Sequence, residues 1–163
     1  MNVTVKHIPE KRVFAVAHRG PYNTFGASFS KLQSVLEASK LEPKAWLEMV
    51  AVQYDDPAKV PRAELRGDAG VVVEAQAELP EGLHEALIPA GRYAVTLHQG
   101  PYEQLGAAWG RFLGGWLEES GHRQGEGPIY ERYLNTPMNA APHELLTELY
   151  IGLVDQGVRK QKV

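Results

Sequence analysis

The sequence predicts an α+β fold built from a duplicated β-α-β-β module. In this fold a mostly antiparallel, curved sheet carries two helices on its outside and has a cleft at the pseudo-twofold seam between the copies. Three observations support the prediction: a near-repeat at an offset of eighty residues, a strand-like segment before a Gly-Pro turn in each copy, and a helical apolar stripe after that turn. Self-similarity at a fixed period indicates a repeated structural unit. One such unit cannot close a core alone, so we expect the two copies to complete each other.

The repeat is clearest in two short segments. Residues 18–22 read His-Arg-Gly-Pro-Tyr, and residues 98–102 read His-Gln-Gly-Pro-Tyr. The same offset aligns further pairs without a gap: Ile8-Pro9 with Ile88-Pro89, Gly26-Ala27 with Gly106-Ala107, and Glu64-Leu65 with Glu144-Leu145. A recurring turn would not keep one register over such a distance. We therefore interpret 1–163 as a single domain with repeats at about 3–77 and 83–154.

Local patterns predict the elements of each copy. Residues 12–18 and 92–98 are rich in β-branched and aromatic side chains and stop at Gly-Pro, which is typical of a strand that ends in a turn. After each turn the apolar residues recur at helical spacing, in the series Phe25, Phe29, Leu32, Leu36 and the series Leu105, Trp109, Phe112, Trp116. The two helices should end near Lys40 and Ser120. Further strands are expected at 47–54, 70–76, 128–134 and 147–154, with long polar loops inside each pair.

Composition narrows the class of protein. Hydrophobic residues make up 44% of the chain and charged residues 23%, as in ordinary globular proteins. The net charge of −3 offers no basic face for nucleic acid. No cysteine is present, which excludes disulfides and fits a reducing compartment. No leader-like or membrane-spanning apolar run occurs, so we expect a cytoplasmic protein without membrane contact.

Cofactor and metal motifs are lacking. The six histidines do not show metal-ligand spacing, so no metal site is expected. No phosphate-binding glycine loop and no nucleophile elbow occur, so the sequence predicts neither a cofactor nor a serine hydrolase.

The copies differ at one chemically informative position. Glu131 lies in the middle of a predicted interior strand, where the first copy has Ala51. Glutamate is depleted in strands and is rarely buried unless it is paired or used. Tyr133 lies on the same face of that strand, and Glu148 and Tyr150 share a face of the next strand. A cleft that combines carboxylate and phenol groups is therefore expected.

Structural interpretations of these residues also remain open. Glu131 would then form an ion pair with Arg132 or lie on a solvated edge, and the tyrosines would be half-buried sheet residues. Trp46 follows no clear period and is either a cleft wall or a loop anchor. Trp109 and Trp116 continue the helical stripe and are assigned to the core.

Several segments together resemble the GyrI-like family, which includes the gyrase-inhibitory protein and the effector-binding domains of AraC-type and MerR-type regulators. The resemblance covers about Val3 to Val154 and rests on these segments: Tyr54-Asp55-Asp56-Pro57, Arg62-Ala63-Glu64-Leu65-Arg66, Gly91-Arg92-Tyr93-Ala94-Val95, Gly100-Pro101-Tyr102, Glu131-Arg132-Tyr133-Leu134-Asn135 and Glu148-Leu149-Tyr150. It implies an aromatic-walled pocket for hydrophobic, often cationic or planar small molecules. It also implies that a buried glutamate makes the charged contact, here Glu131, with Tyr133 and Tyr150 at the nearest aromatic positions.

Three classes of function follow from this resemblance. A stand-alone binding protein would sense or sequester an amphipathic compound at Glu131, Tyr133, Tyr150 and Trp46. Some members of the family resemble hydrolases of cyclopropane-containing toxins. An enzyme of this kind would use Glu131 as a general base that activates water. An interaction protein would contact DNA gyrase. Haem-binding relatives are a lesser alternative. Because no DNA-binding helices precede Val3, direct regulation in cis is not expected. The ligand and the oligomeric state stay open.

Overall fold

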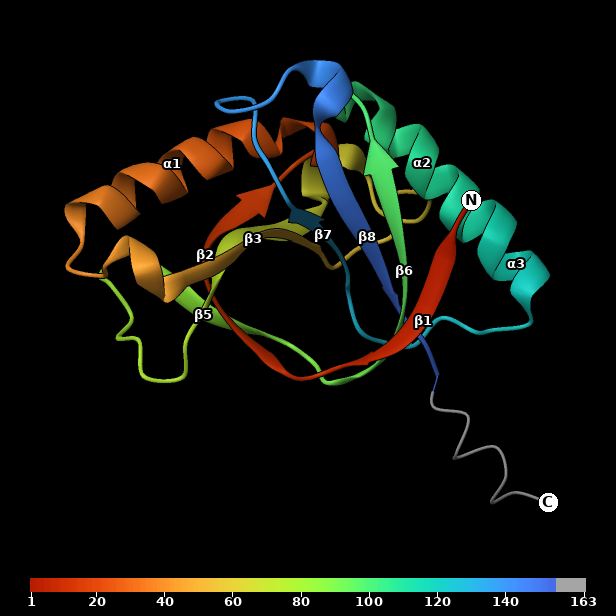
Figure 1. The fold of residues 1–163 in the computed structure, drawn as a ribbon, viewed down its shortest axis with the longest axis horizontal. Helices are drawn as coiled ribbons and strands as arrows, with labels where there is room; N and C mark the ends of the chain where they lie inside the picture. Colours follow the sequence, from red (N-terminus) through yellow and green to blue (C-terminus); the bar gives the residue numbers. More distant parts are fainter. Residues whose placement is uncertain (155–163) are drawn as a thin grey trace.

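The computed structural model describes residues 1–154, which form one curved sheet with helices on one of its faces (Figure 1). The strands are β1 (Val3–Ile8), β2 (Lys11–Arg19), β3 (Trp46–Gln53), β4 (Arg66–Val73), β5 (His84–Ile88), β6 (Gly91–Gln99), β7 (Ile129–Tyr133) and β8 (Leu146–Gly152). The helices are α1 (Phe25–Ala38), α2 (Leu105–Arg111) and α3 (Leu117–Ser120). A π-helical segment, Phe112–Trp116, joins α2 to α3, so these two form one long helix.

The sheet has eight strands in the order β1-β6-β8-β7-β3-β4-β2-β5, and every neighbouring pair is antiparallel. The α+β class with an antiparallel sheet and two outer helical elements agrees with the sequence prediction. The arrangement has the same order in both halves, because β1 to β4 and β5 to β8 occupy mirrored places in that list.

The prediction lacked one strand in each copy. The edge strand β1 pairs with β6 of the second half, and the edge strand β5 pairs with β2 of the first half. Each copy thus gives its first strand to the other copy. Local sequence does not indicate this, because both strands are short and carry several polar, exposed residues, as edge strands commonly do. A second difference is that β4 begins at Arg66 instead of residue 70.

The centre of the sheet is the β3–β7 pair. Ala51 lies directly opposite Glu131, and these two positions are separated by the repeat offset. Each is therefore the other's equivalent in the second copy, and the pseudo-twofold axis passes between them. The difference between alanine and glutamate places one carboxylate at the axis where a perfect repeat would place two or none.

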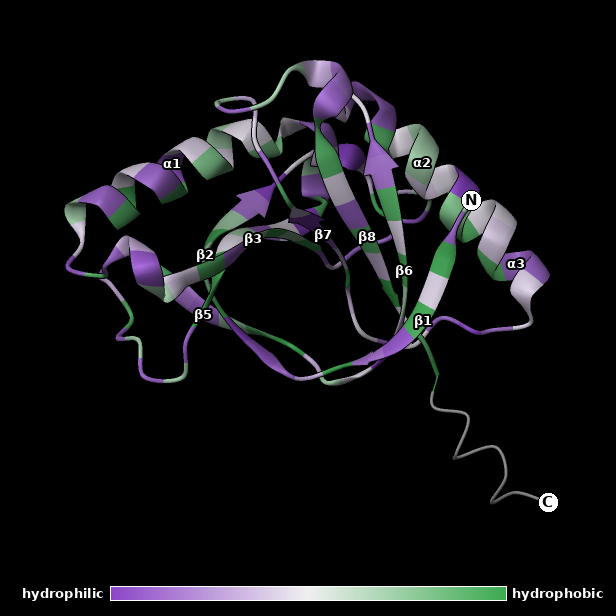
Figure 2. Cartoon of the chain, in the orientation of Figure 1, coloured by the Kyte–Doolittle hydropathy of each residue, from purple (hydrophilic) through white to green (hydrophobic). Residues whose placement is uncertain are grey.

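Both faces of the sheet are apolar along the strands. On the helix-covered face, Leu32 and Leu36 of α1 pack over one half, and Trp109 and Phe112 pack over the other. The helices themselves carry apolar and polar residues on different sides (Figure 2). The helix-free face buries a separate cluster: Ile8, Val13, Ala15, Val50, Val52, Val72, Ile88, Tyr93, Val95, Tyr130 and Tyr150.

Gly70 is a site where this packing is tight enough to give a clear mutational effect. A Cβ atom there would lie 2.5 Å from Cγ1 of Val13 and 2.9 Å from the carbonyl oxygen of Phe14. Because backbone cannot move aside cheaply, Gly70→Ala should lower the free energy of unfolding by about 1–3 kcal/mol in chemical denaturation. The matched control is Gly110→Ala in α2, where an added Cβ would meet no atom within 4 Å outside the adjacent backbone of its own helix. That variant should gain about 0.5–1 kcal/mol, and a loss as large as that of Gly70→Ala would contradict the packing argument.

Candidate functional site

Glu131 is the central residue of the candidate site and is only 5% exposed. Three side chains donate hydrogen bonds to its carboxylate. The Trp109 Nε1–H donates to Oε2 at 2.7 Å, and the Tyr133 hydroxyl donates to Oε1 at 2.5 Å. Gln53 Nε2 donates to Oε2 at 3.3 Å. Helix α2 and strands β3 and β7 thus supply one donor each.

Periodicity explains why these groups converge. Tyr133 follows Glu131 by two residues in β7, so both side chains lie on one face. Gln53 lies two residues beyond Ala51, which is opposite Glu131, and it shares that face. Trp109 lies one helical turn after Leu105, on the stripe of α2 that packs on the sheet.

The electrostatics of Glu131 are unusual. Burial raises its pKa above the ordinary value of 4.5, although the hydrogen bonds from Tyr133, Trp109 and Gln53 act in the opposite direction. All three donors are neutral, so within residues 1–154 no cation balances the carboxylate. The alternative of an ion pair with Arg132 does not hold, because Arg132 lies on the other face and pairs with Glu48 and Glu148.

Aromatic rings from both copies surround this carboxylate. The Tyr133 ring makes an edge-on contact with Phe29 at a centroid distance of 5.5 Å and a second with Tyr102 at 5.6 Å. Phe25 continues the series from α1, 6.0 Å from Phe29. Burial raises the pKa of Tyr102, and the charge of Glu131 adds to this effect. The site therefore combines one buried acid with an apolar, aromatic enclosure at the seam between the copies.

Tyr102 and its equivalent in the first copy, Tyr22, make different contacts. The Tyr22 hydroxyl donates to the carbonyl of Arg66 at 2.6 Å and accepts from the backbone N–H of Asp55 at 3.0 Å, which holds the loop after β3. Asp55 also pairs with Arg66. The second copy has Asn135 and Leu146 at those places. The Tyr102 ring packs on Tyr133 instead, and its hydroxyl forms no hydrogen bond with any of the described residues.

The structure brings together only some of the predicted site residues. Glu131 and Tyr133 share the site, whereas Tyr150 lies on the helix-free face. The reason is register, since Glu131 is opposite Leu149 and Tyr130 is opposite Tyr150. Tyr150 stacks on Tyr130 at 4.3 Å and donates to Glu148 at 2.9 Å. Trp46 packs in the apolar cluster under α1.

Three residues of the site were not predicted as such. Trp109 lies in the core, as its place on the helical stripe predicts, and its indole N–H also donates a hydrogen bond to Glu131. Gln53 is a polar residue directly after the apolar run at 49–52 of β3, and that contrast is a usable signal. Tyr102 belongs to the repeated Gly-Pro-Tyr motif, which indicates the duplication and the family resemblance but assigns the tyrosine no contact in the site.

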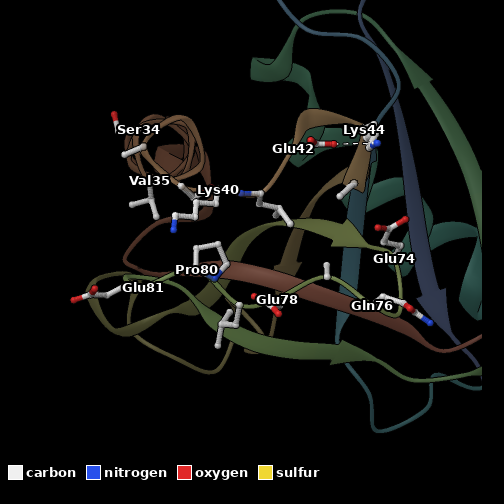
Figure 3. Close-up of a pocket in the computed structure, with 16 residues that line it drawn as sticks. Ser34, Val35, Lys40, Glu42, Lys44, Glu74, Gln76, Glu78, Pro80 and Glu81 are labelled. Carbon is white, nitrogen blue, oxygen red and sulfur yellow. Dashed lines mark hydrogen bonds and ion pairs between the residues drawn. The ribbon is translucent and has the colours of Figure 1, made fainter.

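A surface groove of about 810 Å³ lies elsewhere, beside the carboxyl-terminal half of α1 (Figure 3). Its walls come from α1, the turn that follows it and the segment between β4 and β5. It is lined by Ser34, Val35, Ala38, Ser39, Lys40, Leu41, Glu42, Lys44, Ala45, Glu74, Gln76, Ala77, Glu78, Leu79, Pro80 and Glu81. Because it contains no aromatic side chain and no deeply buried charge, the Glu131 site is the stronger candidate despite being filled by its own side chains.

The raised pKa of Glu131 predicts a pH-dependent stability difference. A folded-state pKa above the unfolded value contributes stability that is complete below the unfolded pKa, near 4.5, and is lost as the pH rises through the folded value. Glu131→Gln removes this titration. The melting temperature of the variant relative to wild type should therefore rise as the pH is increased from below about 4.5 into the range where Glu131 ionises in the folded protein. A difference that stays constant over this range would show that the carboxyl does not titrate abnormally.

Within residues 1–154, no three His, Cys, Asp or Glu side chains are grouped so as to hold a metal ion. No helix of this part of the chain is long and apolar enough to cross a membrane.

Comparison with known proteins places the chain in a family. The GyrI-like small molecule binding domain matches residues 1–154. A protein named DNA gyrase inhibitor from Escherichia fergusonii is 36% identical over 77% of this chain and 83% of its own length. The protein of the same name from Escherichia coli K12 is 32% identical over 83% of this chain and 87% of its own.

Solved structures share the fold at lower identity. The EcmrR C-terminal domain has a TM-score of 0.73 at 21% identity and covers 94% of this chain and 98% of its own. The structure of SAV2435 bound to tetraphenylphosphonium has a TM-score of 0.68 at 9% identity and full coverage of both chains. A hydrolase from Listeria innocua has a TM-score of 0.59 at 11% identity, over 93% of this chain and 91% of its own. By its sequence and its fold, the chain belongs to the GyrI-like family of small-molecule-binding domains.

Proposed function

We propose that this protein binds a hydrophobic small molecule that places a cationic group against Glu131. The observation that supports the proposal is a carboxylate that is 5% exposed and has only neutral hydrogen-bond donors within the described chain. A ligand cation would balance this charge where water screens it little. The rings of Tyr133, Tyr102 and Trp109 would add cation–π and apolar contact.

Ligand entry requires side chains to move. Both carboxylate oxygens already accept hydrogen bonds, and the ring of Tyr133 is packed between Phe29 and Tyr102. Because Glu131 is only 5% exposed, a cation reaches the carboxylate only if enclosing side chains such as Trp109 or Tyr133 move, with loss of some of their packing and hydrogen bonding. The ligand therefore has to offset that loss, which favours large aromatic molecules that bury much apolar surface.

The same geometry weighs against the hydrolase alternative. A general base needs a free oxygen within hydrogen-bond distance of the water that it activates. Oε1 of Glu131 accepts a single hydrogen bond and keeps a second lone pair, but the carboxylate is only 5% exposed, so the surrounding side chains would have to move before a water and a substrate could reach it. Product analysis of any ligand found would decide, because a binding protein returns the ligand unchanged.

Modulation of DNA gyrase is a second candidate, because relatives that carry the name DNA gyrase inhibitor align over most of this chain. The expected contact is between proteins, and the expected location is the cytoplasm, where a chain without cysteine is at no disadvantage. A supercoiling assay with purified gyrase tests this candidate. Inhibition that is unchanged in Glu131→Gln would assign it to the protein surface instead of the ligand site.

The binding proposal is tested by a thermal-shift screen of the full chain. The panel contains tetraphenylphosphonium as the cation, triphenylphosphine oxide as a neutral aromatic of similar shape, and haem. A ligand at a hundredfold its Kd adds about 2.7 kcal/mol of stability. Stabilisation by the cation supports the proposal. Stabilisation by haem alone, or by no compound, contradicts it.

A further inference from the structure

Two polar side chains next to the Glu131 site have no partner. Thr147 in β8 and His98 in β6 lie opposite each other on the helix-covered face, and Thr147 is 0% exposed. Neither Oγ1 of Thr147 nor Nε2 of His98 has a hydrogen-bond partner among residues 1–154, and both atoms are buried. Thr147 is also opposite Tyr133, the residue that binds Glu131. The pair is therefore contiguous with the site through Tyr133.

In the first copy the equivalent histidine has hydrogen-bond partners for both of its ring nitrogens. This histidine, His18, contacts the Ser28 hydroxyl through Nδ1 at 2.8 Å and the Pro21 carbonyl through Nε2 at 3.0 Å. The second copy has Ala108 where the first has Ser28, so the partner of Nδ1 is lost. It retains the proline as Pro101, yet Nε2 of His98 has no partner among the described residues.

At the position of Thr147, too, the second copy has a polar group that the first copy lacks. Its equivalent is Gly67, and a Cβ atom there would lie 2.7 Å from Cζ of Phe25. In the first copy, then, an aromatic ring fills this space. The second copy has the smaller Leu105 in place of Phe25 and adds a hydroxyl. The second copy is thus more polar than the first at the place that adjoins Glu131.

Buried polar groups without partners cost stability, and in a native protein they call for an explanation. We propose that His98 and Thr147 form a hydrogen-bonding subsite that receives a neutral hydroxyl or amide group of the ligand bound at Glu131. A hydroxyl and an imidazole each donate and accept, which suits a ligand group that does both. This inference rests on the proposed function and specifies its ligand: an aromatic cation that carries a neutral polar arm.

Matched ligands test the subsite. Tetraphenylphosphonium is compared by calorimetry with two derivatives that carry a para-hydroxyl or a para-carboxamide on one ring. Wild type should bind at least one derivative roughly three- to tenfold more tightly than the parent, as expected for one added hydrogen bond. Thr147→Val and His98→Phe should each reduce this ratio to about one. A wild-type ratio of one for both derivatives, or a ratio retained in both variants, overturns the subsite.

Failure of the proposed function gives a different result. If wild type and Glu131→Gln bind the parent cation with equal affinity, the proposal of a cation contact at Glu131 is wrong. The subsite is tested separately, by the ratio of the affinities for the derivatives and the parent. A ligand-free measurement adds an independent check. Thr147→Val removes a hydroxyl without a partner and should raise the melting temperature by about 2–4 °C. The control Thr96→Val removes a hydroxyl that donates to the Asn2 carbonyl at 2.7 Å and should lower it. A fall for Thr147→Val would show that its hydroxyl is satisfied and would overturn the proposal.

Discussion

Glu131→Gln is expected to weaken the binding of tetraphenylphosphonium by about a hundredfold, while the affinity for triphenylphosphine oxide stays within about twofold. Removing one partner of a buried charge pair costs several kcal/mol, because water does not replace the lost attraction. The neutral ligand has no charge to lose. Calorimetric titration of both ligands into both proteins measures the two ratios directly, and the cation ratio should persist at high salt because buried charges are screened little.

The matched control is Glu148→Gln. Glu148 lies on the helix-free face and is already paired with Arg132 at 2.8 Å, so its loss should leave both affinities unchanged. Gln is close to Glu in shape and still accepts and donates hydrogen bonds, so Glu131→Gln should fold, and a cooperative melting curve verifies this. Equal weakening of the cation and the neutral ligand would mean that the substitution altered the shape of the site and that Glu131 makes no charged contact.

Separation of the halves is expected to abolish cooperative folding. In the intact chain β1 pairs with β6, β5 pairs with β2, and β3 pairs with β7, so three strand pairs cross between the halves. The fragments 1–80 and 81–163 each lose these pairings and expose the apolar surface that they cover. Neither fragment alone should show a sharp thermal transition by circular dichroism. An equimolar mixture should regain one, with a midpoint that rises with concentration because two chains must associate.

The two fragments should also differ in how strongly each associates with itself. In a homodimer of the first fragment, Ala51 would face its own copy across the seam, whereas a homodimer of the second would place two Glu131 carboxylates against each other. The second fragment should therefore associate with itself less than the first, as sedimentation would show. A sharp transition that does not depend on concentration in either fragment would contradict the view that the halves share one core.

The main elements of the fold were predictable because their signals are local. The strand, the Gly-Pro turn and the helical stripe are each encoded within about ten residues, and the repeat shows them twice. Strands β1 and β5 were missed because their stability comes from pairing with the opposite half. Their own residues are few and partly polar, so nothing within the segments indicates the exchange.

For the site, the sequence by itself determined that an acid occupies the central strand of the second copy, where the first has alanine, and that Tyr133 shares its face. Those inferences need only the repeat and a period of two. Only the tertiary structure decided that Tyr150 lies on the opposite face, that Trp46 packs away from the seam, and that Trp109 of α2 binds Glu131. The physical reason is that faces and partners across a sheet depend on the register between strands distant in the chain, which no local pattern specifies.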